Sequence, residues 1–253
     1  MTAWNALELE AALEEAPTIG ARLDIAHAAM AALGLGALIY DYAPVAYTHE
    51  GELITPSFFG MREVPDDMVD LWSSSGFYQI DPVQHLALNS PRPFVWSYRR
   101  NGQTVLNRAL DERHEPVVTY VHDMAITCGM TVPIHGRSGD CATVTGIRYG
   151  AEDDFHREGA ELLGDFTLLA HAVHAAVEPL FGEAERRSRA VHLTPREREC
   201  LRFSAEGLSA KDISGRLSRS VPTVTMHLNA AARKLGARNR AQMIARAAHY
   251  RLL

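Results

Sequence analysis

One aspartate in the chain has neighbours that suit it to binding a small molecule. Asp81 follows Trp72 by nine residues and precedes Trp96 by fifteen. A carboxylate lodged between two indoles loses its hydration and needs a hydrogen-bond donor to offset that loss, and a ligand N–H group supplies one. Pro82 follows directly and disfavours the α region at Asp81, so the carboxylate could instead cap the next helix.

Met68 lies four residues before Trp72, in a segment whose apolar residues have helical spacing. The two side chains therefore share one face of the predicted helix. Such a pair is typical of an ordinary hydrophobic core. Beside Asp81 and Trp96 it also fits the wall of a ligand pocket, and the residues alone leave both interpretations open.

A second set of residues, near the C-terminus, could read DNA. The segment 220–235 carries an apolar stripe at helical spacing, formed by Val224, Leu228, Ala231 and Leu235. Polar side chains occupy the opposite side of this helix. We expect two residues to contact base edges and four basic residues to contact phosphates, namely Thr225 and Asn229, and Lys211, Arg233, Lys234 and Arg238.

The charge distribution supports a DNA-binding module. The chain has 253 residues and a net charge of −6, but the segment 193–253 contains 12 Lys+Arg against 4 Asp+Glu. That segment is therefore at +8 and the segment 1–192 at −14. A basic terminal segment on an acidic body is the asymmetry typical of a DNA-binding domain joined to another domain.

The cysteines give little support for catalysis or metal binding. Cys128, Cys141 and Cys200 lie far apart, without a CxxC pair or a nearby histidine cluster, so we expect neither a zinc site nor a disulfide framework. We expect no catalytic residue and no cofactor. A hydrolase that uses Cys128 or Cys141 is an alternative, but no base lies near either residue in the sequence.

The sequence predicts no association with a membrane. No apolar run approaches the roughly 20 residues that cross a bilayer, and the first residues lack a basic segment followed by an apolar one. We expect a cytoplasmic protein.

Apolar periodicity and turn residues divide the first 182 residues into alternating helices and strands. We expect helices at 3–15, 19–35, 66–76, 82–88, 105–125 with a break at Pro116, and 152–180, and strands at 37–42, 53–59, 129–134 and 142–149, with a turn-rich segment at 90–98. This order predicts an α/β/α sandwich around one antiparallel sheet, within an α+β chain.

The segment 183–192 is charged, lacks an apolar period and is interpreted as a linker. After it, Thr194, Pro195 and Glu197 form a capping box with a proline in the first turn. We expect helices from there to about Ala205 and at 209–217, 220–235 and 242–250. The second and third of these form a helix-turn-helix, whose later helix enters the major groove.

The last 61 residues closely resemble the LuxR-type, GerE-like helix-turn-helix domain. The match includes Glu197, Leu201, Gly207, Ile213, Leu217, Ser220, Thr223, Val224, His227, Leu228, Lys234, Leu235 and Arg240. Such domains occur both in ligand-driven regulators and in phosphorylation-driven response regulators. A response regulator needs a lysine in its receiver domain, and the segment before residue 193 contains no lysine.

The first 182 residues resemble the autoinducer-binding domain of LuxR-type quorum-sensing regulators. Asp81-Pro82, Trp96 and the run CGMTVPIHGRSGD from Cys128 carry the match. The resemblance implies that Asp81 accepts a hydrogen bond from the ligand amide, that Trp96 lines the lactone end and that Thr145 bonds a ligand carbonyl. Our further candidate ligand contacts are Ile39, Tyr40 and Val117; the first two lie on opposite faces of one predicted strand, and the sequence leaves open which face lines the pocket.

Two positions depart from that family pattern. Members usually have a tyrosine and a tryptophan nine and thirteen residues before the aspartate, and the tryptophan donates its indole N–H to the lactone carbonyl. Here these positions hold Trp72 and Met68, and methionine has no hydrogen to donate. This pair resembles the LuxR solo regulators of plant-associated bacteria, which respond to plant-derived compounds.

The resemblance implies a ligand-responsive transcriptional regulator. We expect a small amide-containing ligand other than an acyl-homoserine lactone, with an acyl-homoserine lactone as the alternative. Ligand would complete the core of the first domain, which would then dimerise and place two C-terminal domains on a roughly palindromic operator in double-stranded DNA. RNA polymerase is a further expected partner.

Overall fold

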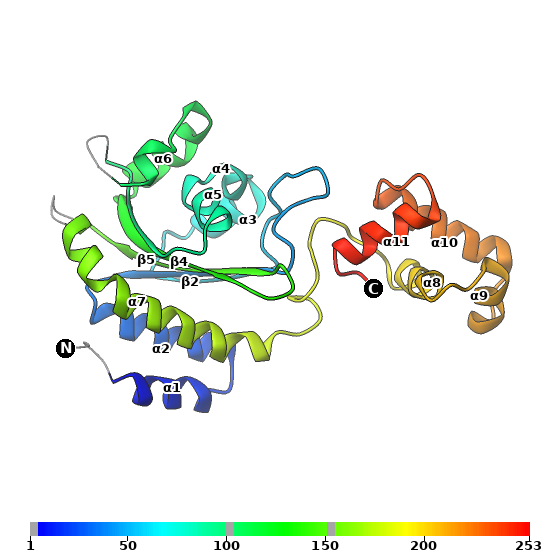
Figure 1. Cartoon of the computed structure of the whole chain (residues 1–253), viewed down its shortest axis with the longest axis horizontal. Coiled ribbons are helices and arrows are strands. Elements are labelled where there is room, and N and C mark those ends of the chain that lie inside the picture. The colour runs from blue at the N-terminus through cyan, green and yellow to red at the C-terminus, as the bar shows by residue number, and fades with distance from the viewer. Residues whose placement is uncertain (1–4, 100–103, 151–154) are drawn as a thin grey trace.

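The computed structural model describes residues 5–99, 104–150 and 155–253, and every structural statement below refers to these residues. Two lobes are visible in Figure 1, an N-terminal lobe built around a sheet and a C-terminal lobe of helices. The sheet has five antiparallel strands in the order β2-β1-β5-β4-β3. Their bounds are β1 Ala37–Ala43, β2 Phe58–Arg62, β3 Phe94–Ser97, β4 Cys128–His135 and β5 Cys141–Arg148.

Helices cover both faces of this sheet, which confirms the predicted sandwich (Figure 1). One face is covered by α1 Ala6–Glu15, α2 Ile19–Ala31 and α7 Phe155–Val177. The other is covered by the short helices α3 Met68–Ser74, α4 Phe77–Ile80, α5 Pro82–Asn89 and α6 Glu115–Asp123. Each face has its own hydrophobic core, because side chains alternate along every strand.

Several predicted elements differ from the structure. The turn-rich segment 90–98 contains β3, a short edge strand that pairs only with β4 and follows Pro91 and Pro93. The second predicted strand is displaced: Leu53 forms an isolated bridge with Tyr47, and β2 begins at Phe58. Helix α4 was not predicted from the sequence. Its four residues are too few to show a helical period.

The predicted helix at 105–125 is also wrong in its first half. Two 3-10 turns occupy Leu106–Arg108 and Glu112–His114, and α6 begins only at Glu115. Pro116 lies in the first turn of α6 and therefore starts a helix instead of interrupting one. The predicted helix ends at residues 3–4 and 152–154 lie outside the described residues.

The C-terminal lobe follows its capping residues closely. Thr194 and Ser209 form capping boxes, and Ser220 and Asn239 accept hydrogen bonds from the first turn of the helices they precede. The helices are α8 Pro195–Ala205, α9 Ala210–Leu217, α10 Val221–Lys234 and α11 Arg240–His249. Four local caps thus fix four helix starts. The last helix begins two residues earlier than expected because Asn239 caps it.

The two lobes are in contact. Val45 and Ile54, from the loop between β1 and β2, pack in one apolar cluster with Leu193, Tyr250 and Leu252 of the C-terminal lobe. The Tyr250 hydroxyl hydrogen-bonds His49 Nδ1 at 2.7 Å. The end of α11 thus docks on the loop that follows the first strand. No helix within the described residues is long and apolar enough to span a membrane.

Candidate ligand site and nucleic-acid interface

A small cavity lies between the sheet and the short helices α3 and α5. Its free volume is about 30 Å³, close to the volume of one water molecule in the liquid. An organic ligand must therefore displace side chains to enter. Six predicted ligand contacts line this cavity, namely Ile39, Met68, Trp72, Asp81, Trp96 and Thr145.

Asp81 is both a helix cap and a pocket residue, so both interpretations of its sequence context apply. Its Oδ1 accepts the Val83 backbone N–H at 2.8 Å, and its Oδ2 accepts the Trp72 indole N–H at 2.8 Å. The Tyr98 hydroxyl donates to Oδ1 at 3.2 Å. Burial raises the pKa of the Asp81 carboxyl above its usual value, although the hydrogen bond from Trp72 favours the charged form.

The sheet side of the cavity has a pair of hydroxyl groups, of which that of Thr145 lines the cavity wall. Antiparallel pairing places Thr131 of β4 directly opposite Thr145 of β5, and their Oγ1 atoms lie 2.9 Å apart. The Trp96 indole N–H donates to Thr131 Oγ1 at 2.9 Å. The indole of Trp96 is thereby fixed against the strand pair. Sequence reasoning missed Thr131. The alternation of side chains along the predicted strand 129–134 puts it on the sheet face opposite to that of Met130.

Two expected ligand contacts lie away from the cavity. Tyr40 points to the opposite face of the sheet, where its hydroxyl hydrogen-bonds His174 Nδ1 at 2.9 Å. Val117 is buried in the core beneath α6 but is absent from the cavity wall. Successive side chains of a strand point to opposite faces. The face of β1 that lines the cavity is therefore the one that carries Ile39, and not the one that carries Tyr40.

Sequence reasoning also missed a buried carboxyl next to this cavity. Asp41 shares the face of Ile39 and is 1 % exposed. Its Oδ2 accepts hydrogen bonds from the Thr143 hydroxyl and, at 3.2 Å, from the Gln84 side-chain amide. Burial raises the pKa of the Asp41 carboxyl to about 7, against the lowering effect of these donors. An aspartate within the otherwise apolar run ALIYDY was the available signal.

The cysteines have surroundings that disfavour nucleophilic chemistry. Burial raises the pKa of the Cys128 thiol to about 11 and that of Cys141 further. A thiol must lose its proton to act as a nucleophile, so these two are held in the unreactive form. The described residues bring together no group of three or more His, Cys, Asp or Glu side chains that could hold a metal ion.

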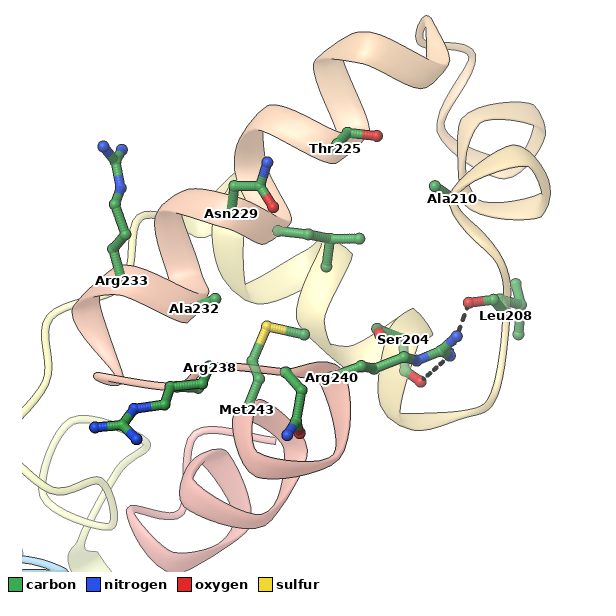
Figure 2. A pocket seen from close by; sticks show the side chains of 13 residues that line it. Ser204, Leu208, Ala210, Thr225, Asn229, Ala232, Arg233, Arg238, Arg240 and Met243 are labelled. Atoms are coloured by element: carbon green, nitrogen blue, oxygen red, sulfur yellow. Dashed lines mark hydrogen bonds between the residues drawn. The ribbon is translucent and has the colours of Figure 1, made fainter.

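The predicted DNA-reading residues lie on one face of α10. Figure 2 shows Thr225, Asn229 and Arg233 on successive turns of the helix, and all three are exposed. They border an open hollow of about 720 Å³, to which Arg238 also contributes. Met226, one position from this line, is 58 % exposed and was not among the expected contacts.

Some basic side chains of this lobe bind other groups of the protein, and others are exposed. Lys234 Nζ lies 2.7 Å from Glu197 Oε2, and that ion pair joins α10 to the start of α8. Arg240 donates to the backbone oxygens of Ser204 and Leu208, as drawn in Figure 2. The Lys234 side chain stays 39 % exposed within this ion pair, so its contact with phosphate remains a prediction. Lys211 is exposed on α9.

Two family models match the chain. The autoinducer binding domain matches residues 19–177, and the bacterial regulatory proteins of the luxR family match residues 191–247. The first match contains the cavity and both buried carboxyls. The second contains α8, α9, α10 and most of α11.

Relatives and solved structures agree with these matches. The chain is 32 % identical over 184 residues to the quorum sensing-dependent regulator RpaR of Rhodopseudomonas palustris, which covers 72 % of this chain and 70 % of RpaR. It is 27 % identical over 215 residues to the activator AhyR of Aeromonas hydrophila, covering 85 % and 79 %. Its fold is similar to that of Escherichia coli SdiA, with a TM-score of 0.57, 20 % identity and coverage of 98 % and 97 %.

The matched relatives are transcriptional regulators, and the lobes of this chain have the corresponding parts: a buried cavity over the sheet and an exposed helix-turn-helix. The chain therefore belongs to the LuxR family of ligand-binding, DNA-binding transcriptional regulators of the quorum-sensing type.

Proposed function

We propose that this regulator senses a small amide-containing molecule, derived from plants, that is not an acyl-homoserine lactone. The observation that carries the proposal is the pair Met68 and Trp72. Both side chains line the cavity and are 3 % exposed. Met68 offers no N–H group, and the indole N–H of Trp72 is directed to Asp81. A lactone carbonyl at this end of the cavity would be buried without a donor, which costs about 1–3 kcal/mol.

The amide requirement follows from Asp81. A ligand N–H would replace or join the Trp72 indole at the carboxylate and would offset its burial without adding a charge. Thr145 lines the same cavity as a hydroxyl partner for a ligand carbonyl, and Thr131 lies behind it at 2.9 Å. An amide has both a donor and an acceptor and therefore fits this pair of groups.

A thermal-shift panel on the full chain tests the ligand class. The panel contains N-hexanoyl-homoserine lactone, the lactone-free amide N-pentylacetamide and plant-extract fractions. We expect stabilisation by the amide and by at least one plant fraction, and none by the lactone. The variant Met68→Trp is the matched control. It supplies an indole N–H at the lactone end, and we expect it to bind the lactone about 10-fold more tightly than the natural protein.

An acyl-homoserine lactone is the second candidate ligand, because the relative RpaR is named as a quorum sensing-dependent regulator. Stabilisation of the natural protein by low concentrations of N-hexanoyl-homoserine lactone would favour this candidate and overturn the reading of Met68. Equal lactone affinity in the natural protein and in Met68→Trp would do the same.

For the output, we propose that residues 1–182 bind ligand, that 183–192 link the domains and that 193–253 bind DNA. Ligand completes the first core, and the folded domain dimerises on a roughly palindromic operator, where it would engage RNA polymerase. Thr225 and Asn229 read base edges, and Lys211, Arg233, Lys234 and Arg238 contact phosphates. Their exposure on α9, α10 and the turn before α11 supports this division.

Two variants test that division of labour. Asn229→Ala should relax sequence preference at one position of the half-site, while Arg233→Ala should weaken specific and non-specific binding alike and reduce the salt slope by about 1. Gel-shift titrations of the full chain at several salt concentrations measure both. An equal loss of sequence discrimination in the two variants would contradict the assignment.

A further inference from the structure

A second buried polar cluster lies beside the Asp81 end of the cavity. It consists of Asp41 on β1, Thr143 on β5, Tyr78 on α4 and Gln84 on α5, and these residues are all buried. Thr143 and Gln84 donate hydrogen bonds to Asp41 Oδ2. The cluster thus draws one residue from each of four elements around a single carboxyl group. None of its four residues is among the predicted ligand contacts or the predicted DNA contacts.

Two polar atoms of this cluster lack hydrogen-bond partners. They are the Tyr78 hydroxyl and the Gln84 side-chain oxygen, both shielded from solvent. Tyr78 is 0 % exposed and Gln84 is 4 % exposed. A buried polar atom without a partner costs free energy, and natural structures seldom keep two in one cluster without a purpose. The Gln84 oxygen therefore lacks a donor, while the Tyr78 hydroxyl lies near Asp41 and favours the charged form of that carboxyl.

The cluster opens toward the cavity through Gln84, which lines the cavity wall together with Asp81 and Thr145. Gln84 also connects the two carboxyls. Its backbone N–H favours the charged form of Asp81, and its side chain donates to Asp41. The charge of Asp81 also raises the pKa of Asp41, which shows that the two carboxyl groups are near one another. A short ligand can reach both.

One chemical group, a primary ammonium, could donate to all the acceptor atoms of this cluster. Asp41, the Gln84 oxygen and the Tyr78 oxygen all accept hydrogen bonds, and a primary ammonium offers three donors. Its positive charge also offsets the cost of a buried carboxylate, which a neutral hydroxyl cannot do. Burial raises the pKa of Asp41 to about 7, the nearby charge of Asp81 adds to this, and the hydrogen bonds from Thr143 and Gln84 oppose it.

We propose that Asp41, Gln84 and Tyr78 form a subsite for a protonated amine, so that the ligand carries an amide at one end and a primary amine a few bonds away. This inference rests on the proposed function, because it takes the amide at Asp81 as given. It narrows the ligand class to short acylated diamines and similar amino amides. Acyl-homoserine lactones have an apolar chain in place of the amine.

Isothermal titration of the full chain with two matched probes tests the subsite. N-acetylputrescine carries the amide and the amine, and N-pentylacetamide has a methyl group in place of the amine. We expect N-acetylputrescine to bind the natural protein about 10- to 100-fold more tightly, the effect of one or two hydrogen bonds to a charged group. Asp41→Asn should remove that difference and leave binding of N-pentylacetamide unchanged.

A second variant guards against misfolding of Asp41→Asn. Tyr78→Phe removes a hydroxyl that forms no close hydrogen bond but favours the charged form of Asp41, so we expect its melting temperature to stay close to that of the natural protein. Its affinity for N-acetylputrescine should nevertheless fall several-fold, with that for N-pentylacetamide unchanged. If the hydroxyl had only a structural role, the variant would differ from the natural protein in melting temperature, and its affinity for each probe would be unchanged.

The outcomes separate the two proposals. If N-pentylacetamide binds as tightly as N-acetylputrescine, or if Asp41→Asn and Tyr78→Phe weaken both probes equally, the amine subsite is overturned and the amide site stands. If neither probe binds the natural protein, both proposals are overturned. If Asp81→Asn abolishes binding of both probes while Asp41→Asn affects only the amine, both are supported.

Discussion

The two faces of the single five-stranded sheet differ in what they bury. The face under α1, α2 and α7 packs apolar side chains such as Phe166, Leu169 and Val173. The face under the short helices buries two aspartates and three threonine hydroxyls among its apolar side chains. A long helix seals the first face, whereas four helices of at most nine residues cover the second.

This difference separates stability from function within one domain. An apolar face against a long helix contributes the free energy of burial and has no unmet hydrogen bonds. Buried carboxyls on the other face cost free energy unless donors meet them. Asp41 and Asp81 both lie on the face to which we assign the ligand. In our proposal the apolar face stabilises the fold and the polar face responds to the ligand.

The largest expected effect lies on the sealed face. Phe166→Ala removes a ring that is 0 % exposed and should lower the free energy of unfolding by about 3–5 kcal/mol. Leu168→Ala on the same helix, at a position 58 % exposed, is the control and should change it by less than about 0.5 kcal/mol. Urea titration measures both. Probe affinity per folded molecule should be unchanged, and a selective loss of affinity in Phe166→Ala would break the comparison.

The next effect is a pH dependence on the polar face. The unfolded Asp41 carboxyl has a pKa of about 3.9, and its pKa in the folded protein is raised to about 7. The folded state therefore binds this proton more tightly, and the stability it contributes is lost as pH rises toward 7. Between about pH 5 and pH 8 the free energy of unfolding should fall by about 2–3 kcal/mol.

Asp41→Asn tests that dependence, since an amide does not titrate. The groups that face Asp41 are Asp81, whose pKa is raised as well, and the un-ionised Tyr78 and Cys141. Asp81 adds a slope of the same sign, so the variant should keep a smaller slope and not a zero one. Urea unfolding at pH 5 and pH 8 measures it. An identical slope in both proteins would show that Asp41 is not the source.

Trp72→Phe should lower the free energy of unfolding and raise the affinity for N-pentylacetamide. The expected size lies between those of the other variants. The variant removes the indole N–H from Asp81 Oδ2, which should cost about 1–3 kcal/mol of stability. The freed oxygen becomes available to a ligand amide, so affinity for N-pentylacetamide should rise. Calorimetric titration and urea unfolding of the same preparation measure the two quantities. A parallel loss of both would contradict the view that Trp72 occupies the ligand's position at Asp81.

The smallest effect is expected from Tyr40→Phe on the sealed face. It removes the hydrogen bond to His174 and should lower the free energy of unfolding by about 0.5–1.5 kcal/mol. Affinity for either probe should not change, because the side chain points away from the cavity. A change in affinity larger than the change in stability would place Tyr40 back among the ligand contacts.

Local signals in the sequence predicted the C-terminal lobe better than the N-terminal one. Helix starts there depend on caps such as Thr194 and Ser209, whose partners lie three residues away. The polar face depends on contacts between distant residues, such as Asp41 with Thr143 and Gln84, 102 and 43 residues apart. No local pattern reports such pairs. The edge strand β3 was missed for the same reason, since only its pairing with β4 makes it a strand.

The candidate site also combines features that the sequence predicts with features that only tertiary contacts decide. Residues identified through the family resemblance, such as Asp81 and Trp96, lie at the cavity. Tyr40 lies on the other face of the sheet, which only the orientation of β1 decides, and the ion pair of Lys234 with Glu197 forms only when α8 and α10 pack. Residue type and spacing identified the chemistry, and tertiary packing decided which side chains are free to perform it.

The central claim is that the polar face of the sheet binds an amide ligand through Asp81. Isothermal titration of the full chain and of Asp81→Asn with N-pentylacetamide, N-acetylputrescine and N-hexanoyl-homoserine lactone tests it most directly. We predict that the two lactone-free amides bind the natural protein and lose about 100-fold in affinity in Asp81→Asn, because a charged acceptor is replaced. Equal affinity in the two proteins, or no binding of any amide to the natural protein, would contradict the claim.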